Sequence, residues 1–394
     1  MCCYLFYYTG RQTFGFAIPG IEEELGVSKE TLGWVSAAML WSYAIGQSIN
    51  GNLGDKFGGR RMMSLGAVLS SCLNWLVSFA SSLQGLSVTW ATNGFVQSMG
   101  WAPGSRVISN WWPQHQRGRA YGCYVFAAGL SSVLTFALST IILECGLNWR
   151  WIFRLPVLLL LGAGMMYFLV ARDRPEDLGF AADDPPRKKN QDTEARPKMT
   201  TSWDRYLAAL KNGPFLIASV AIGCQNLARY GLIIWVPVHF LGDDWKTSST
   251  KWISIALPIG MALGAIASGW ISDRFYSANR SRVIVLFMAS AAISSVAMWL
   301  LPRDSVLAIP LLFFTGFFAY GPQSAFWALC PDLLGRHRAG TGTGVMNTSA
   351  YIFAGLGEPL IGKTIDLTGD TSVVFAIVAV ACAIGASIAV FIRR

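Results

Sequence analysis

Two arginines stand inside otherwise apolar stretches of the sequence, at Arg11 and Arg229. Each lies eight residues before a proline, Pro19 or Pro237, and 218 positions separate the two members of both pairs. At ~1.5 Å per helical residue, Arg11 would lie ~15 Å from either end of a membrane helix, near the middle of a ~30 Å hydrocarbon core. A charge at that depth is costly, so we expect it to face a cavity that holds water or a ligand.

Two guanidinium groups at one depth repel each other in a medium of low dielectric constant. They are tolerated if a doubly charged anion lies between them, and their planar forks match phosphate oxygens in bidentate geometry. The alternative is that each arginine pairs with a carboxylate. Glu358 is the main candidate within the apolar stretches, with Asp55 and Asp273 at their ends. We predict an anion site.

Polar side chains share a helical face with each arginine. Tyr4, Tyr8 and Arg11 follow the spacing i, i+4, i+7, and Asn226 precedes Arg229 by three residues. Residues at these spacings lie on one side of a helix. We expect these hydroxyl and amide groups to hydrogen-bond an oxyanion or a sugar hydroxyl. Packing is the alternative role of the two tyrosines.

The composition is that of a membrane protein. Of 394 residues, 53% are hydrophobic and only 13% are charged, whereas soluble domains carry about 25% charged residues. The net charge of +9 comes from Lys and Arg in short loops, which argues against nucleic-acid binding. Eight cysteines occur without a CxxC pair, and no catalytic cluster or metal-ligand spacing is seen. The sequence therefore predicts neither an enzyme nor a metal or cofactor site.

The apolar pattern predicts twelve transmembrane spans of ~20 residues or slightly more. Lys and Arg concentrate in every second loop, so both termini and the loop between spans six and seven are expected in the cytoplasm. The chain begins inside its first span and shows no cleavable signal peptide, so we expect residues upstream of Met1. The predicted spans are 2–21, 31–53, 62–81, 84–110, 119–143, 152–171, 213–241, 251–272, 283–301, 306–330, 340–365 and 372–392.

The two halves of the chain repeat each other. Asp55 and Asp273 follow the second and eighth spans 218 positions apart, and Pro103 and Pro322 lie 219 apart in the fourth and tenth. Such spacing indicates an internal duplication with a two-fold axis along the membrane normal. The sequence thus predicts an all-α membrane protein with two six-helix bundles, which places Arg11 opposite Arg229. The predicted parts are an N-terminal bundle (1–171), a cytoplasmic linker (172–211) and a C-terminal bundle (212–394).

The loop after the second span resembles the signature of the major facilitator superfamily. It reads Gly51-x-x-x-Asp55-x-x-Gly-x-Arg60-Arg61. The resemblance implies that the aspartate and the arginines form a gating latch at the cytoplasmic ends of helices. The predicted gating residues are Asp55, Arg60, Arg61, Arg106, Asp273 and Arg274.

Within that superfamily, three stretches are similar to the organophosphate:phosphate antiporters: residues 7–19, 100–112 and 228–237. The resemblance implies that Arg11 and Arg229 bind the phosphate of the substrate. It also implies further residues that line the cleft, and two glutamines join them by position. These are Tyr124, Tyr320, Asn347 and Tyr351, with Gln12 and Gln47.

The chain departs from this family at four positions. Gln12 and Gln47 stand where lysine is usual, Ala128 aligns with a histidine of glycerol-3-phosphate transporters, and Glu358 replaces a small or neutral residue. The prediction is a monomeric rocker-switch antiporter of the cell membrane that exchanges an organic phosphate for inorganic phosphate. One alternative is a proton-coupled symporter of a sugar acid or sulfonate, with Glu358 as the proton carrier. The other is a transporter-like sensor of sugar phosphate.

Overall fold

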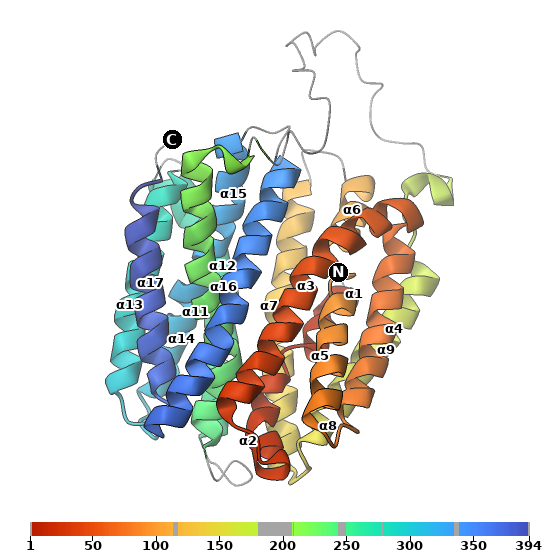
Figure 1. The fold of residues 1–394 in the computed structure, drawn as a ribbon. Coiled ribbons are helices and arrows are strands. Elements are labelled where there is room, and N and C mark those ends of the chain that lie inside the picture. The colour runs from red at the N-terminus through yellow and green to blue at the C-terminus, as the bar shows by residue number, and fades with distance from the viewer. Residues whose placement is uncertain are drawn as a thin grey trace.

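The computed structural model describes residues 2–112, 117–179, 207, 209–242, 250–276, 279–334 and 339–392. All regular secondary structure in these ranges is helical, and the helices form two bundles side by side (Figure 1). The N-terminal bundle contains α1 (Cys2–Leu5), η1 (Tyr7–Gly10), α2 (Phe14–Leu25), α3 (Lys29–Phe57), α4 (Gly59–Val77), α5 (Leu83–Gln97), α6 (Trp101–Trp111), α7 (Arg117–Glu144), α8 (Arg150–Arg154) and α9 (Pro156–Val170).

The C-terminal bundle follows η2 (Pro175–Leu178). It contains α11 (Gly213–Leu241), η3 (Lys251–Ile255), α12 (Ala256–Phe275), α13 (Arg280–Leu300), α14 (Ala308–Tyr320), α15 (Pro322–Leu334), α16 (Ala339–Thr368) and α17 (Val373–Ala389). The predicted fold class is thereby confirmed. The boundaries 1–171 and 212–394 stay a prediction, because most of the linker 172–211 lies outside the described residues.

Local sequence explains where several helices start. The Ser28 side chain accepts a hydrogen bond from the Thr31 backbone N–H at the start of α3, and Asn212 accepts one from Phe215 at the start of α11. These caps satisfy donors that the first helical turn leaves without a partner. At the other end of α3, Gly58 adopts a positive φ of 88°, which costs glycine less than any other residue.

The described helices include five that are long and apolar enough to cross a membrane. These are Phe126–Glu144, Arg150–Val170, Gly213–Leu241, Lys251–Ser272 and Arg280–Leu300. Other predicted spans are interrupted in the structure. The fourth is divided between α5 and α6, and the tenth between α14 and α15 at Gly321. Pro322 follows that glycine directly and lacks the N–H that a continuous helix would use.

The first span also departs from the prediction. Tyr4, Tyr8 and Arg11 were expected on one face of a continuous helix, and this is wrong, because α1 ends at Leu5 and a 3₁₀ turn follows. The rings of Tyr4 and Tyr8 still contact each other, with centroids 5.9 Å apart. The residues therefore lie together although the helix does not continue between them.

The two bundles contact each other at the end where α2 ends and α3 begins, which is the lower end in Figure 1. There α3 packs along α16 and α2 packs on α11. Glycines allow this approach. A Cβ on Gly33 would lie 2.6 Å from the carbonyl oxygen of Glu358, and one on Gly362 would collide with the Lys29 carbonyl. The backbones of α3 and α16 are therefore in near-direct contact.

Polar contacts also join the bundles at this lower end. The Asp366 carboxylate at the end of α16 accepts hydrogen bonds from the backbone N–H groups of Lys29 (3.1 Å) and Glu30 (2.7 Å). An acceptor from one bundle therefore caps the first turn of α3 in the other. Lys251 forms a second cross-bundle pair with Glu144, at an N–O distance of 2.6 Å. Side-chain bonds thus add to the glycine contacts that close the lower end.

Candidate functional site

The first span loses its helical geometry at Arg11, Gln12 and Thr13, between η1 and α2. Irregular backbone at membrane depth needs partners for its freed polar groups, and it is tolerated where it is buried in protein or lines a cavity. The Gly10 carbonyl, just before the break, accepts hydrogen bonds from Asn74 Nδ2 (3.0 Å) and Asn93 Nδ2 (2.7 Å). Side chains of α4 and α5 therefore hold the break in place.

A buried polar network supports these two asparagines. The Ser70 hydroxyl donates to Asn93 Oδ1 (2.7 Å), and Gln97 Nε2 donates to Ser70 Oγ (2.6 Å). A Cβ on Gly10 would lie 2.5 Å from Gln97 Nε2, so the backbone of the break lies directly on the network. These residues were not predicted, although amides and hydroxyls that recur within apolar spans were a usable signal.

Replacing Asn93 with leucine is expected to lower the free energy of unfolding by about 1–3 kcal/mol. The variant would remove one of the two donors to the Gly10 carbonyl and the acceptor of the Ser70 hydroxyl. Thermal unfolding in detergent measures the effect. Thr92→Val is the control, because the exposed Thr92 hydroxyl donates to the Val88 carbonyl of its own helix and to no other group among the described residues. Equal unfolding temperatures for the two variants would contradict the role of Asn93.

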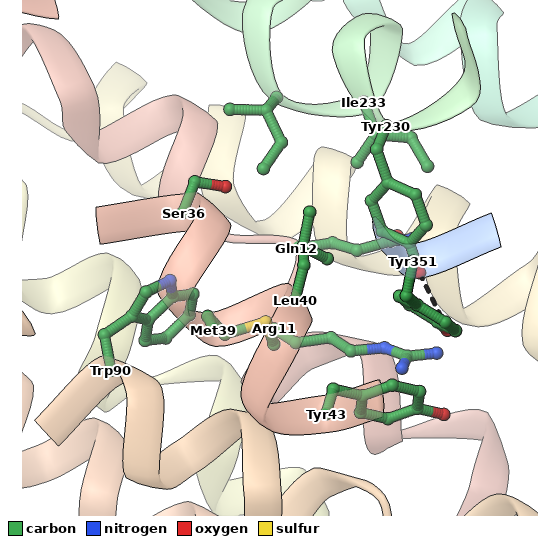
Figure 2. A pocket seen from close by; sticks show the side chains of 11 residues that line it. Arg11, Gln12, Ser36, Met39, Leu40, Tyr43, Trp90, Tyr230, Ile233 and Tyr351 are labelled. Atoms are coloured by element: carbon green, nitrogen blue, oxygen red, sulfur yellow. Dashed lines mark hydrogen bonds between the residues drawn. The ribbon is translucent and has the colours of Figure 1, made fainter. Parts of the chain in front are cut away.

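The Arg11 side chain extends from the break toward the interface between the bundles. Its side chain is only 7% exposed. The guanidinium carbon lies 4.0 Å from the ring centroid of Tyr8 and 4.8 Å from that of Tyr43. Figure 2 shows the side chain extending past Tyr43 toward Tyr230 and Tyr351. Aromatic faces attract the cation in this buried site.

Arg229 has a matching environment in the C-terminal bundle. It lies in the middle of α11, is 5% exposed, and its guanidinium carbon is 4.3 Å from the Tyr320 ring centroid and 4.9 Å from that of Tyr230. Among the described residues, no ion pair links Arg11 or Arg229 to a carboxylate.

A small pocket lies beside Arg11, between the bundles (Figure 2). Its volume is about 10 Å³, which is about the space that one water molecule needs. An organic anion does not fit in this conformation, so its entry requires the bundles to move apart. The lining residues are Arg11, Gln12, Ser36, Met39, Leu40, Tyr43, Trp90, Tyr230, Ile233, Ile234 and Tyr351.

Polar atoms in this region lack partners among the described residues. They are Nε of Arg11, Nε of Arg229, and both amide atoms of Gln12. Buried polar groups are normally hydrogen-bonded, so each such atom calls for an explanation. A ligand that enters when the bundles separate would supply partners for all four.

Some of the other predicted binding residues lie at the pocket beside Arg11, and others do not. The Tyr351 hydroxyl lies 3.1 Å from the Tyr230 hydroxyl, and the Tyr351 ring packs on Tyr43. Asn226 instead donates to the Ile222 carbonyl of its own helix. Tyr43 and Tyr230 were not predicted. Tyr230 directly follows Arg229 in the sequence, and Tyr43 lies one helical turn before Gln47, so both positions offered a signal.

Tyr4 and Tyr124 belong to an aromatic cluster that reaches the site through Tyr8, whose ring contacts Tyr4. Their ring centroids are 4.4 Å apart, and the Tyr124 hydroxyl donates to the Gly100 carbonyl at the break between α5 and α6. Asn347 and Gln47 are half-buried on α16 and α3, and Gln47 Nε2 has no partner among the described residues. A binding role for these four residues remains a prediction.

The predicted gating residues lie at the upper ends of the bundles. Arg106 donates to the Gly54 carbonyl (2.7 Å), and Arg60 donates to the Phe168 carbonyl (2.7 Å). The Asp173 carboxylate, which was not predicted, accepts from the Arg60 backbone N–H and so caps α4. Arg61 and Arg274 are exposed, and the side chains of Asp55 and Asp273 lie outside the description. The latch stays a prediction.

Glu358 does not neutralise the arginines in this conformation. It is fully buried on α16, and its Oε2 accepts a hydrogen bond from Trp235 Nε1 (2.9 Å). Its Oε1 has no partner among the described residues. The carboxyl group therefore lies against α11 at the closed end.

Two helical bundles that enclose a cationic site at membrane depth define a class of protein, the secondary transporters. The chain belongs to the Major Facilitator Superfamily, whose family model matches residues 1–358. It is therefore a multi-pass membrane transporter and not an enzyme. Solved structures agree on the fold. A D-xylose-proton symporter superposes with a TM-score of 0.73 at 17% identity, covering 100% of this chain and 96% of that one.

Curated relatives resemble the chain over nearly its whole length. The glycerol-3-phosphate transporter of Bacillus subtilis is 29% identical, covering 89% of this chain and 80% of the relative. A Chlamydia pneumoniae protein named "Probable hexose phosphate transport protein" is 26% identical, covering 96% and 86%. The membrane sensor protein UhpC of Salmonella typhimurium is also 26% identical, covering 97% and 87%. The predicted resemblance to organophosphate transporters is thereby confirmed.

Proposed function

We propose that the protein carries an organic phosphate of the sugar or glycerol phosphate type across the membrane in exchange for inorganic phosphate. The observation that supports this most strongly is the pair Arg11 and Arg229. One guanidinium group comes from each bundle, both are buried, and each lies over tyrosine rings. Neither group has a carboxylate partner among the described residues. A phosphate dianion supplies the missing charge and accepts from both groups.

The same charges favour exchange over one-way transport. In the empty site two cations remain in a medium of low dielectric constant, where their repulsion is strong. Reorientation without an anion is therefore costly, whereas an anion that bridges the bundles lets one bundle rock against the other around it. If the termini are cytoplasmic, as the charge pattern predicts, the closed lower end faces outward.

Counterflow in proteoliposomes tests the proposal. Vesicles that contain purified protein and are loaded with phosphate should take up radiolabelled phosphate, glycerol 3-phosphate or glucose 6-phosphate. Vesicles without internal phosphate should show little uptake, because the empty carrier does not return. Equal uptake with and without internal phosphate would contradict obligatory exchange. No uptake of any phosphate compound would contradict the proposed function as a whole.

Glu358→Gln is expected to leave phosphate exchange within about twofold of the wild type. Glutamine keeps an oxygen that accepts from Trp235 Nε1, and antiport requires no proton from this group. The exchange rate should show the same dependence on pH in both proteins. Uptake driven by an acid outer solution and lost in Glu358→Gln would instead support the proton-coupled symporter.

A sensor is the second candidate, because the similarity to UhpC covers 97% of the chain. A sensor of sugar phosphate needs the binding site but not rapid alternation between two open states. It would show ligand-induced thermal stabilisation with negligible counterflow. Robust counterflow would favour the transporter.

A further inference from the structure

Gln12 is the neighbour of Arg11 in the break of the first span, and its surroundings differ from those of the arginine. The side chain is 3% exposed and lines the pocket between the bundles. Both atoms of its amide, Oε1 and Nε2, lack a hydrogen-bond partner among the described residues. In Figure 2 the side chain extends from the break toward Tyr230, as Arg11 does.

A buried amide without partners is unfavourable, because it has lost its hydrogen bonds to water and gained none in return. The nearby asparagines differ, because Asn74 and Asn93 both donate to the Gly10 carbonyl, and of their amide atoms only Asn74 Oδ1 lacks a partner among the described residues. The backbone break also fixes Gln12 next to the residue that would hold the phosphate. Its free donor and acceptor are therefore placed to meet a group attached to that phosphate.

The remaining wall of the pocket restricts which group this can be. Apart from Arg11, the described lining residues are uncharged. Apolar side chains predominate near the break, and the Ser36 hydroxyl is the short polar group among them. When the arginines hold the phosphate, a second anionic group of the cargo, such as a carboxylate, would be buried here without a cation of its own, which is strongly unfavourable. A neutral group avoids this cost.

We propose that Gln12 determines specificity by binding a hydroxyl group of the organic part of the cargo. A hydroxyl both donates and accepts, so it can bond to Oε1 and Nε2 together. The cargo is then a hydroxylated phosphate monoester without a second anionic group. This inference rests on the proposed phosphate transport. It adds that the tail of the cargo is recognised by Gln12 and the phosphate by the arginines.

Competition experiments with Gln12→Leu test the inference. Inhibition of phosphate counterflow is measured with glycerol 3-phosphate, with propyl phosphate, which lacks both hydroxyls, and with 3-phosphoglycerate, in which a carboxylate replaces the terminal CH2OH group. The wild type should prefer glycerol 3-phosphate to each of the others. In Gln12→Leu the preference for glycerol 3-phosphate over propyl phosphate should fall at least about tenfold, because leucine offers the cargo hydroxyl no hydrogen-bond donor or acceptor. Elution as a single species in detergent shows that the variant folds, and inhibition by each competitor is compared with inhibition by unlabelled phosphate in the same variant.

Gln12→Lys provides the converse test. A cation at this position should admit the carboxylate, so 3-phosphoglycerate should compete relatively better than in the wild type. Gln84→Leu, at an exposed position of α5, is the matched control and should behave as the wild type. The inference is wrong if Gln12→Leu weakens all competitors and phosphate equally, or if the wild type does not distinguish glycerol 3-phosphate from propyl phosphate. Absence of any phosphate exchange in the wild type would instead reject the proposed function.

Discussion

Lysine in place of Arg11 or Arg229 should reduce phosphate counterflow at least about 100-fold. That factor corresponds to about 2.8 kcal/mol, within reach of losing a bidentate contact in a desolvated site. Lysine keeps the positive charge but presents a compact ammonium group in place of the planar fork. It also gives up the stacking of the guanidinium plane on Tyr8 or Tyr320. The loss therefore tests geometry and not merely charge.

The measurement has a matched control. Arg282→Lys makes the same chemical change at an exposed position at the start of α13 and should leave counterflow unchanged. Elution as a single species in detergent would show that the Arg11 and Arg229 variants fold. If either variant exchanges phosphate at the wild-type rate, the two-arginine site is not where the anion binds.

Gly33→Val is expected to reduce counterflow by a comparable factor while phosphate still binds. The Cβ of the new side chain would lie 2.6 Å from the carbonyl oxygen of Glu358. Because both atoms are fixed to the backbone, a change of rotamer cannot relieve this contact. The lower end could then no longer close, and alternating access needs closure at each end in turn. Phosphate should still raise the unfolding temperature, because Gly33 is not among the residues that line the pocket.

Gly162→Val is the control for this substitution. It lies on α9, and a Cβ there would meet no atom within 4 Å, so counterflow should be retained. Normal exchange by Gly33→Val would mean that α3 and α16 need not touch during the cycle. Loss of phosphate-induced stabilisation would mean that the site itself had been disturbed.

The sequence was sufficient for the fold because membrane spans follow from length and hydropathy. It also located Arg11 and Arg229 at matching positions, since a charge within an apolar span is conspicuous. The break between η1 and α2 could not be predicted in this way. Neither glycine nor proline occupies the break itself, and what stabilises it is the pair Asn74 and Asn93 on other helices. No local pattern connects these asparagines to Gly10.

Contacts between the bundles could not be predicted from sequence patterns either. Asp366 bonds to Lys29 across 337 positions of the chain, and a carboxylate at a span end fits a solvated surface equally well. Tyr43 and Tyr230 resemble packing residues until the arginines are seen against their rings. The sequence does not reveal which helices of the two bundles pack together, because this depends on the conformation as well as on the residue types.

The Asp366 cap influences which conformation of the protein is favoured. The N-terminus of α3 carries a partial positive charge from the helix dipole, and its counter-charge belongs to the opposite bundle. When the bundles separate at this end, the N-terminus of α3 and the Asp366 carboxylate are exposed to solution, where water and dissolved ions compete for them. Because this contact lies at an exposed edge, mobile ions screen it. The ionic strength of the compartment at the lower end therefore biases the distribution of conformers through a contact that is separate from the buried cations at the centre.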